Sequence, residues 1–385
     1  MTPSSRALPL SGLELAAGIA IGANAAAARR LPRVERTPRE ALIDAIRPAL
    51  ERPPAVVSFS GGTDSSAVLA VATEAARRHG LADPVPVSLR FGGVASAAES
   101  EWQELVVGHL KLADWQRIEL SGELDFLGER AQAGLGAHGL LWPANAHFHG
   151  PVFERAVGGS VLTGIDGDGL LGTWRWAHAR SVLAGRRAFE LRDALRIALA
   201  LSPTPLRAAR LAAQVHPHAV WLRGGAMRRL RLRLIGEFAG EPSRWDRRLD
   251  WYARRRYLRV GVHSLALLAA PHDALVVHPL LDERFLAALA LQGGRAGYGG
   301  RGEALRALFG DLLPAELVGR RTKGEFGAAM WGEQARGFAA DWDGSGVDPE
   351  LVDANVLREV WAQPNPPLAA ATVLQAAWLA GHGAG

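Results

Sequence analysis

Ser60-Gly61-Gly62-Thr63-Asp64-Ser65-Ser66 decides the fold of this chain, because an apolar strand leads into it and a helix leads out of it. Residues 55–59 (AVVSF) have β-branched and aromatic character, and residues 67–80 open with an apolar helical pattern. Adjacent glycines tolerate a positive φ, and the amides at a helix N-terminus face anions such as phosphate. We therefore interpret the stretch as a phosphate-binding turn. The alternative is a helix N-cap with glycine spacing and no ligand.

The kind of phosphate-binding turn follows from the residues around it. No lysine follows the glycines, so the stretch is not a GxxxxGK[ST] loop that grips β- and γ-phosphates. It resembles the PP-loop (SGGxDS) of ATP pyrophosphatases. This resemblance implies that the turn binds pyrophosphate while a substrate carboxylate attacks the α-phosphorus of ATP. The ATP-binding residues it predicts are Ser60, Gly61, Gly62, Thr63, Asp64, Ser65 and Ser66.

The segments around this turn alternate between strand and helix patterns. Further strands are predicted at residues 85–91, 116–120 and 159–163, and helices at 38–50 and 100–112. The first of these helices has an N-cap threonine, then a proline, and a glutamate at its third position. Such alternation predicts an α/β fold with a doubly wound parallel sheet that binds its ligand at the carboxyl ends of the strands. From about residue 178 onward the pattern is helical, apart from a short strand at 274–277.

The composition excludes several classes of protein. The chain of 385 residues contains no cysteine, which excludes disulfides, thiolate metal sites and cysteine nucleophiles, including the PP-loop enzymes that move sulfur onto RNA. Its hydrophobic content of 48% supports a sizeable core. The apolar run at residues 13–28 is interrupted by Glu14, and we expect neither an export signal nor a membrane span. A chain that consumes ATP is expected in the cytoplasm.

The basic residues are 42 arginines and only two lysines, Lys111 and Lys323. Residues 181–260 alone hold 18 arginines against six acidic residues. A solvated helix face explains such an excess, and so does a surface for an acidic peptide or carrier. Because no recognisable nucleic-acid-binding module accompanies the arginines, we expect no nucleic acid partner.

Five landmarks occur in the order typical of one family. They are the turn at 60–66; Glu99-Ser100-Glu101-Trp102; Leu162-Thr163-Gly164-Ile165-Asp166-Gly167-Asp168; His278-Pro279-Leu280-Leu281-Asp282; and Arg321-Thr322-Lys323-Gly324-Glu325-Phe326. Over residues 38–335 the chain resembles the synthetase domain of the asparagine synthetase family, which includes β-lactam synthetases and lasso peptide cyclases. The resemblance implies a PP-loop fold and an ATP-dependent ligase that activates a carboxylate as an acyl-adenylate for attack by an amine.

Two acidic residues and one lysine carry the predicted chemistry. Asp64 and Asp168 each follow a glycine turn at the end of a predicted parallel strand, so they could share one Mg²⁺ together with phosphate oxygens. The resemblance places the family's metal ligands at these positions. It also places the catalytic lysine at Lys323, in a chain that otherwise avoids lysine. A compact ammonium can follow charge that migrates from the α-phosphate during the reaction.

Three further residues complete the predicted site. Glu99 is assigned to orient substrate or ATP, with the alternative that it only initiates a helix near the positive end of its dipole. Gly164 and Leu89 are added to the ATP-binding residues. The cofactors are then ATP and Mg²⁺. The partners are the carboxylate and amine groups of a peptide or small molecule, with a precursor-peptide-binding protein or a protease as a candidate protein partner.

The chain departs from the family in its N-terminal part. Glutamine-dependent members carry a glutaminase domain whose catalytic cysteine follows the initiator Met, whereas Thr2 stands here. We divide the chain into a lead-in at residues 1–50, interpreted as a remnant of that domain, a synthetase domain at 51–340 and a helical extension at 341–385.

A second departure concerns the turn after the fourth strand. Asparagine synthetases typically read SGEGxDE here, with the glutamate proposed to deprotonate ammonia, but Ile165 stands in its place. Isoleucine cannot accept a proton, so base chemistry at this position is lost unless Asp166 replaces it. A bulkier amine than ammonia is favoured, and we predict a peptide or natural-product cyclase or ligase. The alternatives are an asparagine synthase fed with ammonia and a non-catalytic nucleotide-binding protein.

Some chemistry-like patterns are interpreted as structural. β-Lactam synthetases use a tyrosine–glutamate pair as base, and no such pair can be assigned among Tyr252, Tyr257 and Tyr298. Residues 297–302 match GxGxxG, but no strand precedes them, so a loop is predicted.

Three polar residues outside these patterns are judged in the same way. His147 and His149 lack a third ligand for a metal. Asp282 precedes Glu283-Arg284-Phe285, which favours a helix N-cap.

Overall fold

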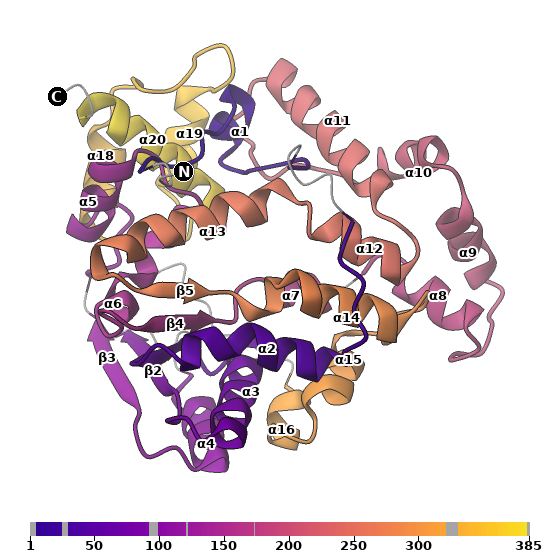
Figure 1. The fold of residues 1–385 in the computed structure, drawn as a ribbon. Coiled ribbons are helices and arrows are strands. Elements are labelled where there is room, and N and C mark those ends of the chain that lie inside the picture. Colours follow the sequence, from indigo (N-terminus) through magenta and orange to yellow (C-terminus); the bar gives the residue numbers. More distant parts are fainter. Residues whose placement is uncertain are drawn as a thin grey trace.

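The computed structural model describes residues 5–24, 30–91, 99–120, 122–172, 174–320 and 330–382. Five strands form one sheet in the order β3-β2-β1-β4-β5, with every neighbouring pair parallel. The strands are β1 (Ala55–Ser58), β2 (Val85–Phe91), β3 (Gln116–Leu120), β4 (Ser160–Thr163) and β5 (Leu275–Val277). The sheet and its flanking helices (Figure 1) confirm the predicted α/β doubly wound fold.

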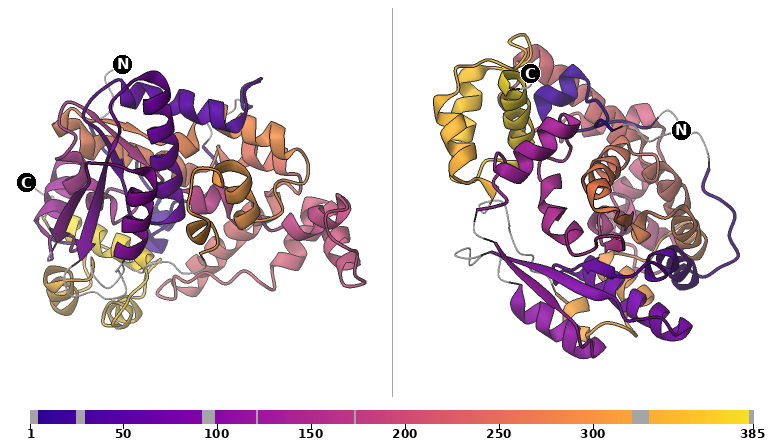
Figure 2. Two further views of the ribbon diagram at one scale, coloured as in Figure 1. Left: turned by 90° about the horizontal axis from the view of Figure 1, so that it is seen from below. Right: turned by 60° about the vertical axis from the view of Figure 1, so that its left-hand side comes forward.

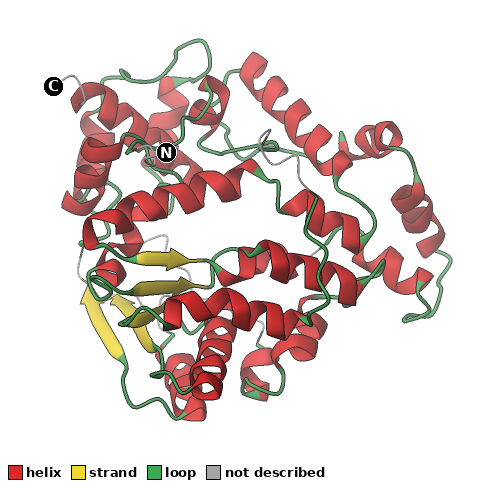
Figure 3. Cartoon of the chain, viewed as in Figure 1, coloured by secondary structure: helices red, strands yellow, loops and turns green. Residues whose placement is uncertain are grey.

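Helices make up most of the remaining structure, as Figure 3 shows. The α-helices are α1 (Gly12–Ala17), α2 (Pro38–Leu50), α3 (Thr63–His79), α4 (Ser100–Leu110), α5 (Glu129–His138), α6 (Gly150–Phe153), α7 (Gly167–Leu171), α8 (Ala177–Leu183), α9 (Asp193–Leu201), α10 (Thr204–Leu211), α11 (Gly224–Gly240), α12 (Trp245–Tyr252), α13 (Arg256–Ala269), α14 (Glu283–Gly293), α15 (Arg301–Phe309), α16 (Ala315–Val318), α18 (Glu333–Asp341), α19 (Ala354–Trp361) and α20 (Leu368–His382). Short 3₁₀ turns are η2 (Ala146–His149), η3 (Ala270–His272) and η4 (Pro279–Leu281).

Both faces of the sheet are buried, as the crossovers of a parallel sheet require. Val57 faces a cluster that includes side chains of α2 and α3, whereas its neighbour Val56 faces α6 and α13 on the other side. The N-terminus of α2 matches its sequence signal, because Thr37 accepts a hydrogen bond from the Glu40 amide and the two residues form a capping box. The helix after β1 begins already at Thr63, inside the glycine turn.

A second hydrophobic cluster extends from β2 and β3 to the two ends of the chain. α1 packs against α20 and α11, and Trp221 and Trp361 are fully buried in this cluster. Glu14, the acid in the apolar N-terminal run, is buried and forms an ion pair with Arg256 at 2.6 Å. Of the helices in the described parts of the chain, none has the length and apolar content that a membrane span requires. The division of the chain at residues 50 and 340 stays a prediction.

The arginine-rich region forms a helical arm on the side away from β3. α8, α9 and α10 extend beyond the rest of the molecule at the right of Figure 1, and α11 lies next to α10 toward the top. The left view of Figure 2 shows the same arm from below. Arg228, Arg229 and Arg233 of α11 are exposed. Leu191, which precedes α9, and Leu195, which lies within it, are exposed as well. The predicted solvated face and the predicted surface for an acidic partner both remain compatible with this placement.

Candidate active site

The turn after β1 is stabilised by its own serines. Gly61 has a φ of +83°, and a Cβ at this position would lie 2.8 Å from Cγ of Gln103, so glycine is needed here. The Ser65 and Ser66 hydroxyls donate to the Gly62 carbonyl over 3.1 and 2.8 Å. The first amides of α3 have no carbonyl partner within the helix, which leaves this turn suited to bind an anion.

The turn after β4 packs directly against the first turn. Ser58 and Thr163 are register partners at the ends of adjacent parallel strands, so the two turns emerge side by side. A Cβ at Gly164 would lie 2.6 Å from the Ser65 amide nitrogen, and one at Gly167 would lie 2.6 Å from Oδ1 of Asp64. The two turns can therefore pack this closely only because Gly164 and Gly167 have no side chain.

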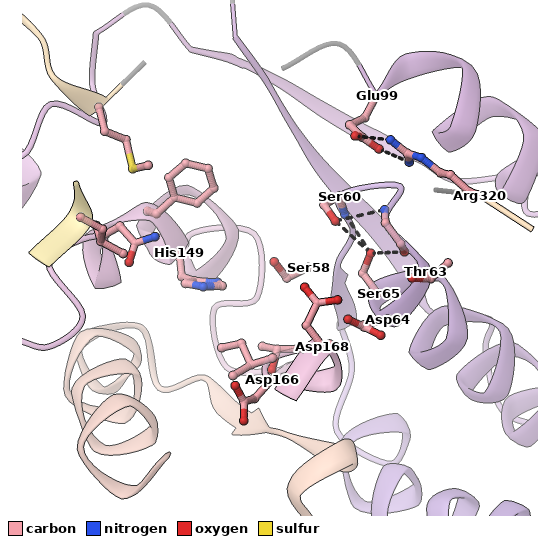
Figure 4. A pocket seen from close by; sticks show the side chains of 18 of the residues that line it. Ser58, Ser60, Thr63, Asp64, Ser65, Glu99, His149, Asp166, Asp168 and Arg320 are labelled. Carbon is pink, nitrogen blue, oxygen red and sulfur yellow. Dashed lines mark hydrogen bonds and ion pairs between the residues drawn. The ribbon is translucent and has the colours of Figure 1, made fainter. Parts of the chain in front are cut away.

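This packing brings the two predicted metal ligands together. Nη2 of Arg301 lies 2.8 Å from Oδ1 of Asp64 and 3.0 Å from Oδ1 of Asp168, so both carboxylates contact one cationic nitrogen. Figure 4 shows Asp64 and Asp168 beside each other at the cavity, close to Ser58. Their side chains are 15% and 52% exposed, so a ligand in the cavity can reach both.

Two carboxylates that converge on one cation fit Mg²⁺, which binds one or two protein carboxylates and takes its other ligands from phosphate and water. No group of three or more His, Cys, Asp or Glu side chains suited to a metal occurs among the described residues. A magnesium ion bound by Asp64 and Asp168 would therefore take its other ligands from the phosphates of the nucleotide and from water.

Glu99 lies on the other side of the first turn. Its carboxylate contacts both terminal nitrogens of Arg320, with Nη2 to Oε1 at 2.6 Å, and Figure 4 shows this pair above Thr63. The Arg320 guanidinium also lies over the ring of Trp102, 4.7 Å from its centroid. Glu99 is the N-cap residue of α4, but its side chain makes no capping hydrogen bond. The structure thus gives its carboxylate a specific arginine partner instead of the helix end.

A cavity of about 990 Å³ connects these groups. Its polar part is formed by the two turns, and Figure 4 places His149 across the cavity from them. The other part is mainly apolar and is lined by Phe126, Phe148, Met330, Trp331, Pro366 and Leu368. The cavity therefore combines a part suited to bind an anion with a part lined by apolar side chains.

Asp166 is held by two tyrosines that lie far away in the sequence. Its φ of +63° is unusual for a residue with a Cβ. The Tyr257 hydroxyl donates to Oδ2 of Asp166 over 2.9 Å, and the Tyr252 hydroxyl donates to the same oxygen. Burial raises the pKa of Asp166, and the two tyrosine hydrogen bonds oppose that rise. Tyr298, by contrast, donates to Gln292. These contacts fix the second turn; they do not identify the base.

The two histidines differ in their surroundings. Both ring nitrogens of His147 lie 3.1 Å from backbone carbonyl oxygens, those of Ala144 and Leu124, so this ring is part of the packing. Nδ1 of His149 is buried without a hydrogen-bond partner among the described residues. Burial lowers the pKa of His149 to about 4, so the ring that faces the cavity is neutral at pH 7.

Several predicted residues lie outside this arrangement. Lys323 falls outside the described residues, and its catalytic role stays a prediction. Leu89 packs between two hydrophobic clusters and is not among the described residues that line the cavity. Ser66 is fully buried beneath the turn. Asp282 caps α14 by accepting from the amides of Arg284 and Phe285, which confirms the predicted N-cap.

Sequence reasoning missed Arg301, Arg320 and the tyrosine contacts of Asp166. Arg301 belongs to the glycine-rich stretch 297–302, which was predicted to be a loop without a role in a site. The residues before Arg301 do form a connector, but Arg301 itself is the first residue of α15, and its side chain lies in the cavity. A basic residue directly after a run of glycines was the only local signal.

The comparisons with known proteins agree with the geometry. The family model described as asparagine synthase matches residues 37–380, which covers the sheet, both glycine turns and the cavity. Among curated proteins, no match to the chain was found.

Proposed function

Because the chain belongs to the asparagine synthase family, we propose that it is an ATP-dependent carbon–nitrogen ligase that forms AMP and pyrophosphate. A substrate carboxylate oxygen attacks the α-phosphorus of ATP, and the bond to the β-phosphate breaks. An amine nitrogen then attacks the acyl carbon and AMP leaves, while the amine gives its proton to an acceptor that is not assigned. The observation that carries this proposal is the contact between two glycine turns, each bearing an aspartate, at one cavity.

The chain's own residues have distinct tasks in this scheme. The amides of the first turn and of α3 bind the leaving pyrophosphate. Asp64 and Asp168 would hold Mg²⁺, which when bound would offset negative charge on the phosphates. Lys323, placed by the sequence motif, stabilises charge on the α-phosphate as the bond breaks. The Glu99–Arg320 pair fixes the start of α4 beside the first turn.

The substrate is inferred from the cavity and from the second turn. Ile165 lines the cavity where the family's proton acceptor is expected, and apolar side chains line another part of the same cavity. Both observations favour a peptide or natural-product amine over ammonia. We propose a cyclase or ligase of a peptide or related metabolite, working in the cytoplasm and not on nucleic acid or membranes. A precursor-peptide-binding protein or a protease is the expected partner.

A pyrophosphate-release assay with candidate acids tests the proposal. Release that depends on the acid, on Mg²⁺ and on Asp64, with an amide product when a peptide amine is present, would support it. An amide formed only from aspartate and ammonia would favour the asparagine synthase alternative. Tight ATP binding without pyrophosphate release, over a broad set of acids, would favour a non-catalytic nucleotide-binding protein.

A further inference from the structure

Arg301 connects the two glycine turns through a single guanidinium. Besides Asp64 and Asp168, its Nη2 donates to Oγ1 of Thr63 over 2.8 Å, and its Nη1 donates to the Gly167 carbonyl over 3.2 Å. The side chain starts at the first position of α15, and it is 27% exposed toward the cavity. Arg301 thus occupies the position between the two carboxylates at which a shared metal ion would be bound.

We propose that Arg301 is a phosphate-binding residue that exchanges partners when the nucleotide binds. Without nucleotide it bridges Asp64 and Asp168; with Mg·ATP it turns from the carboxylates to phosphate oxygens. This inference rests on the proposed function, because it assumes that the cavity binds a polyphosphate together with Mg²⁺.

The first argument is competition for the same oxygens. Magnesium requires oxygen ligands at about 2.0–2.1 Å, whereas Nη2 of Arg301 already contacts the Oδ1 atoms of both aspartates. A guanidinium stays charged at every physiological pH. A Mg²⁺ bound through these Oδ1 atoms would lie next to the guanidinium, and the two positive charges would repel each other. Magnesium that binds through these oxygens therefore displaces Arg301 from them.

The second argument is the presence of another anion site within reach. Arg301 already contacts Thr63, the first residue of α3, where phosphate is expected to bind. The guanidinium fork matches phosphate as well as it matches carboxylate. The helix that carries it is fixed, because Ala304 and Leu305 of α15 are buried in the main core. A rotation of the side chain is sufficient for the exchange, and α15 need not move.

The consequence is that metal and polyphosphate should bind cooperatively. Phosphate draws Arg301 away from Asp64 and Asp168, which exposes the carboxylates to Mg²⁺. By linkage, each ligand then raises the affinity for the other by the same factor. Mg²⁺ alone should bind weakly to the wild-type chain, because it has to displace a cation that is part of the protein.

Isothermal titration of the full chain with two probes tests this directly, with no turnover involved. The probes are Mg²⁺ alone and inorganic pyrophosphate in the presence of a chelator. We expect Arg301→Gln to raise the affinity for Mg²⁺ alone by about fivefold or more and to lower the affinity for metal-free pyrophosphate by a similar factor. The matched control is Arg306→Gln, an exposed arginine on the same helix, which should change neither affinity.

A higher affinity for Mg²⁺ together with a lower affinity for pyrophosphate distinguishes the proposal from a purely structural role of Arg301. If both affinities fall in Arg301→Gln, the arginine only holds the carboxylates in place, and the proposal is wrong; the same follows if the pyrophosphate affinity does not change. Should the glutamine variant not fold, Arg301→Lys keeps the charge without the fork and must still weaken pyrophosphate binding. A wild-type chain that does not bind Mg·ATP would overturn the proposed function itself, whereas normal Mg·ATP binding with unaltered variants overturns this inference alone.

Discussion

Glu99 and Arg320 form a buried two-point ion pair across the first turn, where α4 begins and the chain leaves α16. Their side chains are 6% and 7% exposed, and the Nη2–Oε1 distance is 2.6 Å. Glu99 was predicted to orient substrate or to initiate a helix. In the structure it pairs with Arg320, which stands immediately before the Arg321–Phe326 motif, and its role toward substrate stays a prediction. The pair therefore holds the first residue of the Glu99–Trp102 landmark against Arg320.

Removal of both partners should cost less stability than the sum of the two single removals. Glu99→Gln leaves the Arg320 charge buried without its carboxylate, and the loss of unfolding free energy should be about 3 kcal/mol. The double variant with Arg320→Gln should lose less than the sum of the two single losses. Urea unfolding of the four proteins measures this coupling. Asp83→Asn breaks the exposed Arg77–Asp83 pair and should cost less than about 1 kcal/mol. Additive losses for Glu99 and Arg320 would mean that the pair contributes no coupling.

Asp64 and Asp168 should act as one unit in adenylation. If both hold one Mg²⁺, Asp64→Asn and Asp168→Asn should each abolish pyrophosphate release while the fold stays intact. The double variant should then be hardly worse than either single variant, because the metal site is already lost. Pyrophosphate release at saturating Mg²⁺, with circular dichroism as the control for folding, decides the question. Modest losses that add up in the double variant would rule out a shared metal.

The contact between the two turns can be tested at Gly167. A Cβ there would lie 2.6 Å from Oδ1 of Asp64, so Gly167→Ala should displace the aspartate and cost about 1–3 kcal/mol of stability. Adenylation should fall by more than the stability loss explains. Gly136→Ala is the matched control, because Gly136 lies in α5 with no atom near its added Cβ and the change should stabilise the helix slightly. A Gly167→Ala variant with wild-type pyrophosphate release would show that the turns tolerate separation.

The sheet was predictable because its signals are local. Val56 and Val57 lie in a short apolar run bounded by prolines and by the glycine turn. Thr37 and Glu40 form the capping-box pattern that predicts the start of α2. The predicted strand bounds agree with the observed ones to within one residue, since backbone geometry and turn chemistry determine them.

The completed site was not predictable in the same way. Arg301 is 237 residues away from Asp64, and Arg320 is 221 residues away from Glu99. The chain has 42 arginines, and the sequence next to Arg301 or Arg320 does not distinguish these two from the others. Tyr252 and Tyr257 meet Asp166 only because α12 and α13 fold back over the second turn. Such contacts depend on the tertiary arrangement, to which a single sequence gives no direct access.

A pH dependence of stability should come from His278. Burial, and then the nearby His149, lower the pKa of His278 to about 4, whereas an unfolded histidine has its usual value near 6.5. Between these two values the unfolded chain binds the extra proton, so stability is complete above about pH 6.5 and is lost as the pH falls toward 4. The upper bound on this loss is about 3 kcal/mol.

Unfolding experiments between pH 4.5 and 7.5 measure this effect. His278→Asn should reduce the slope of the stability curve over that range, because its amide can still bond to Thr163 but cannot take up a proton. His149, whose pKa is also lowered to about 4, keeps its own share of the slope. The control is His218→Asn, which changes an exposed histidine and should leave the slope as it is. An unchanged slope in His278→Asn would show that other groups cause the acid sensitivity.

Lys323→Arg should be nearly as inactive as Lys323→Ala. The chain uses 42 arginines, yet lysine stands at this one motif position. Arginine keeps the charge but presents a broad planar fork, while the reacting phosphate needs a compact donor that can shift between oxygens. Loss of such a donor typically costs about 3–4 kcal/mol of transition-state stabilisation, or roughly 10²–10³ in rate. Affinity for Mg·ATP should fall much less, because the interaction strengthens only as charge develops.

Pyrophosphate release and ATP binding, measured on both Lys323 variants, separate the effect on turnover from the effect on affinity, with Lys111→Arg as the control for the chain's other lysine. Near-normal turnover in Lys323→Arg would reduce Lys323 to a general positive charge.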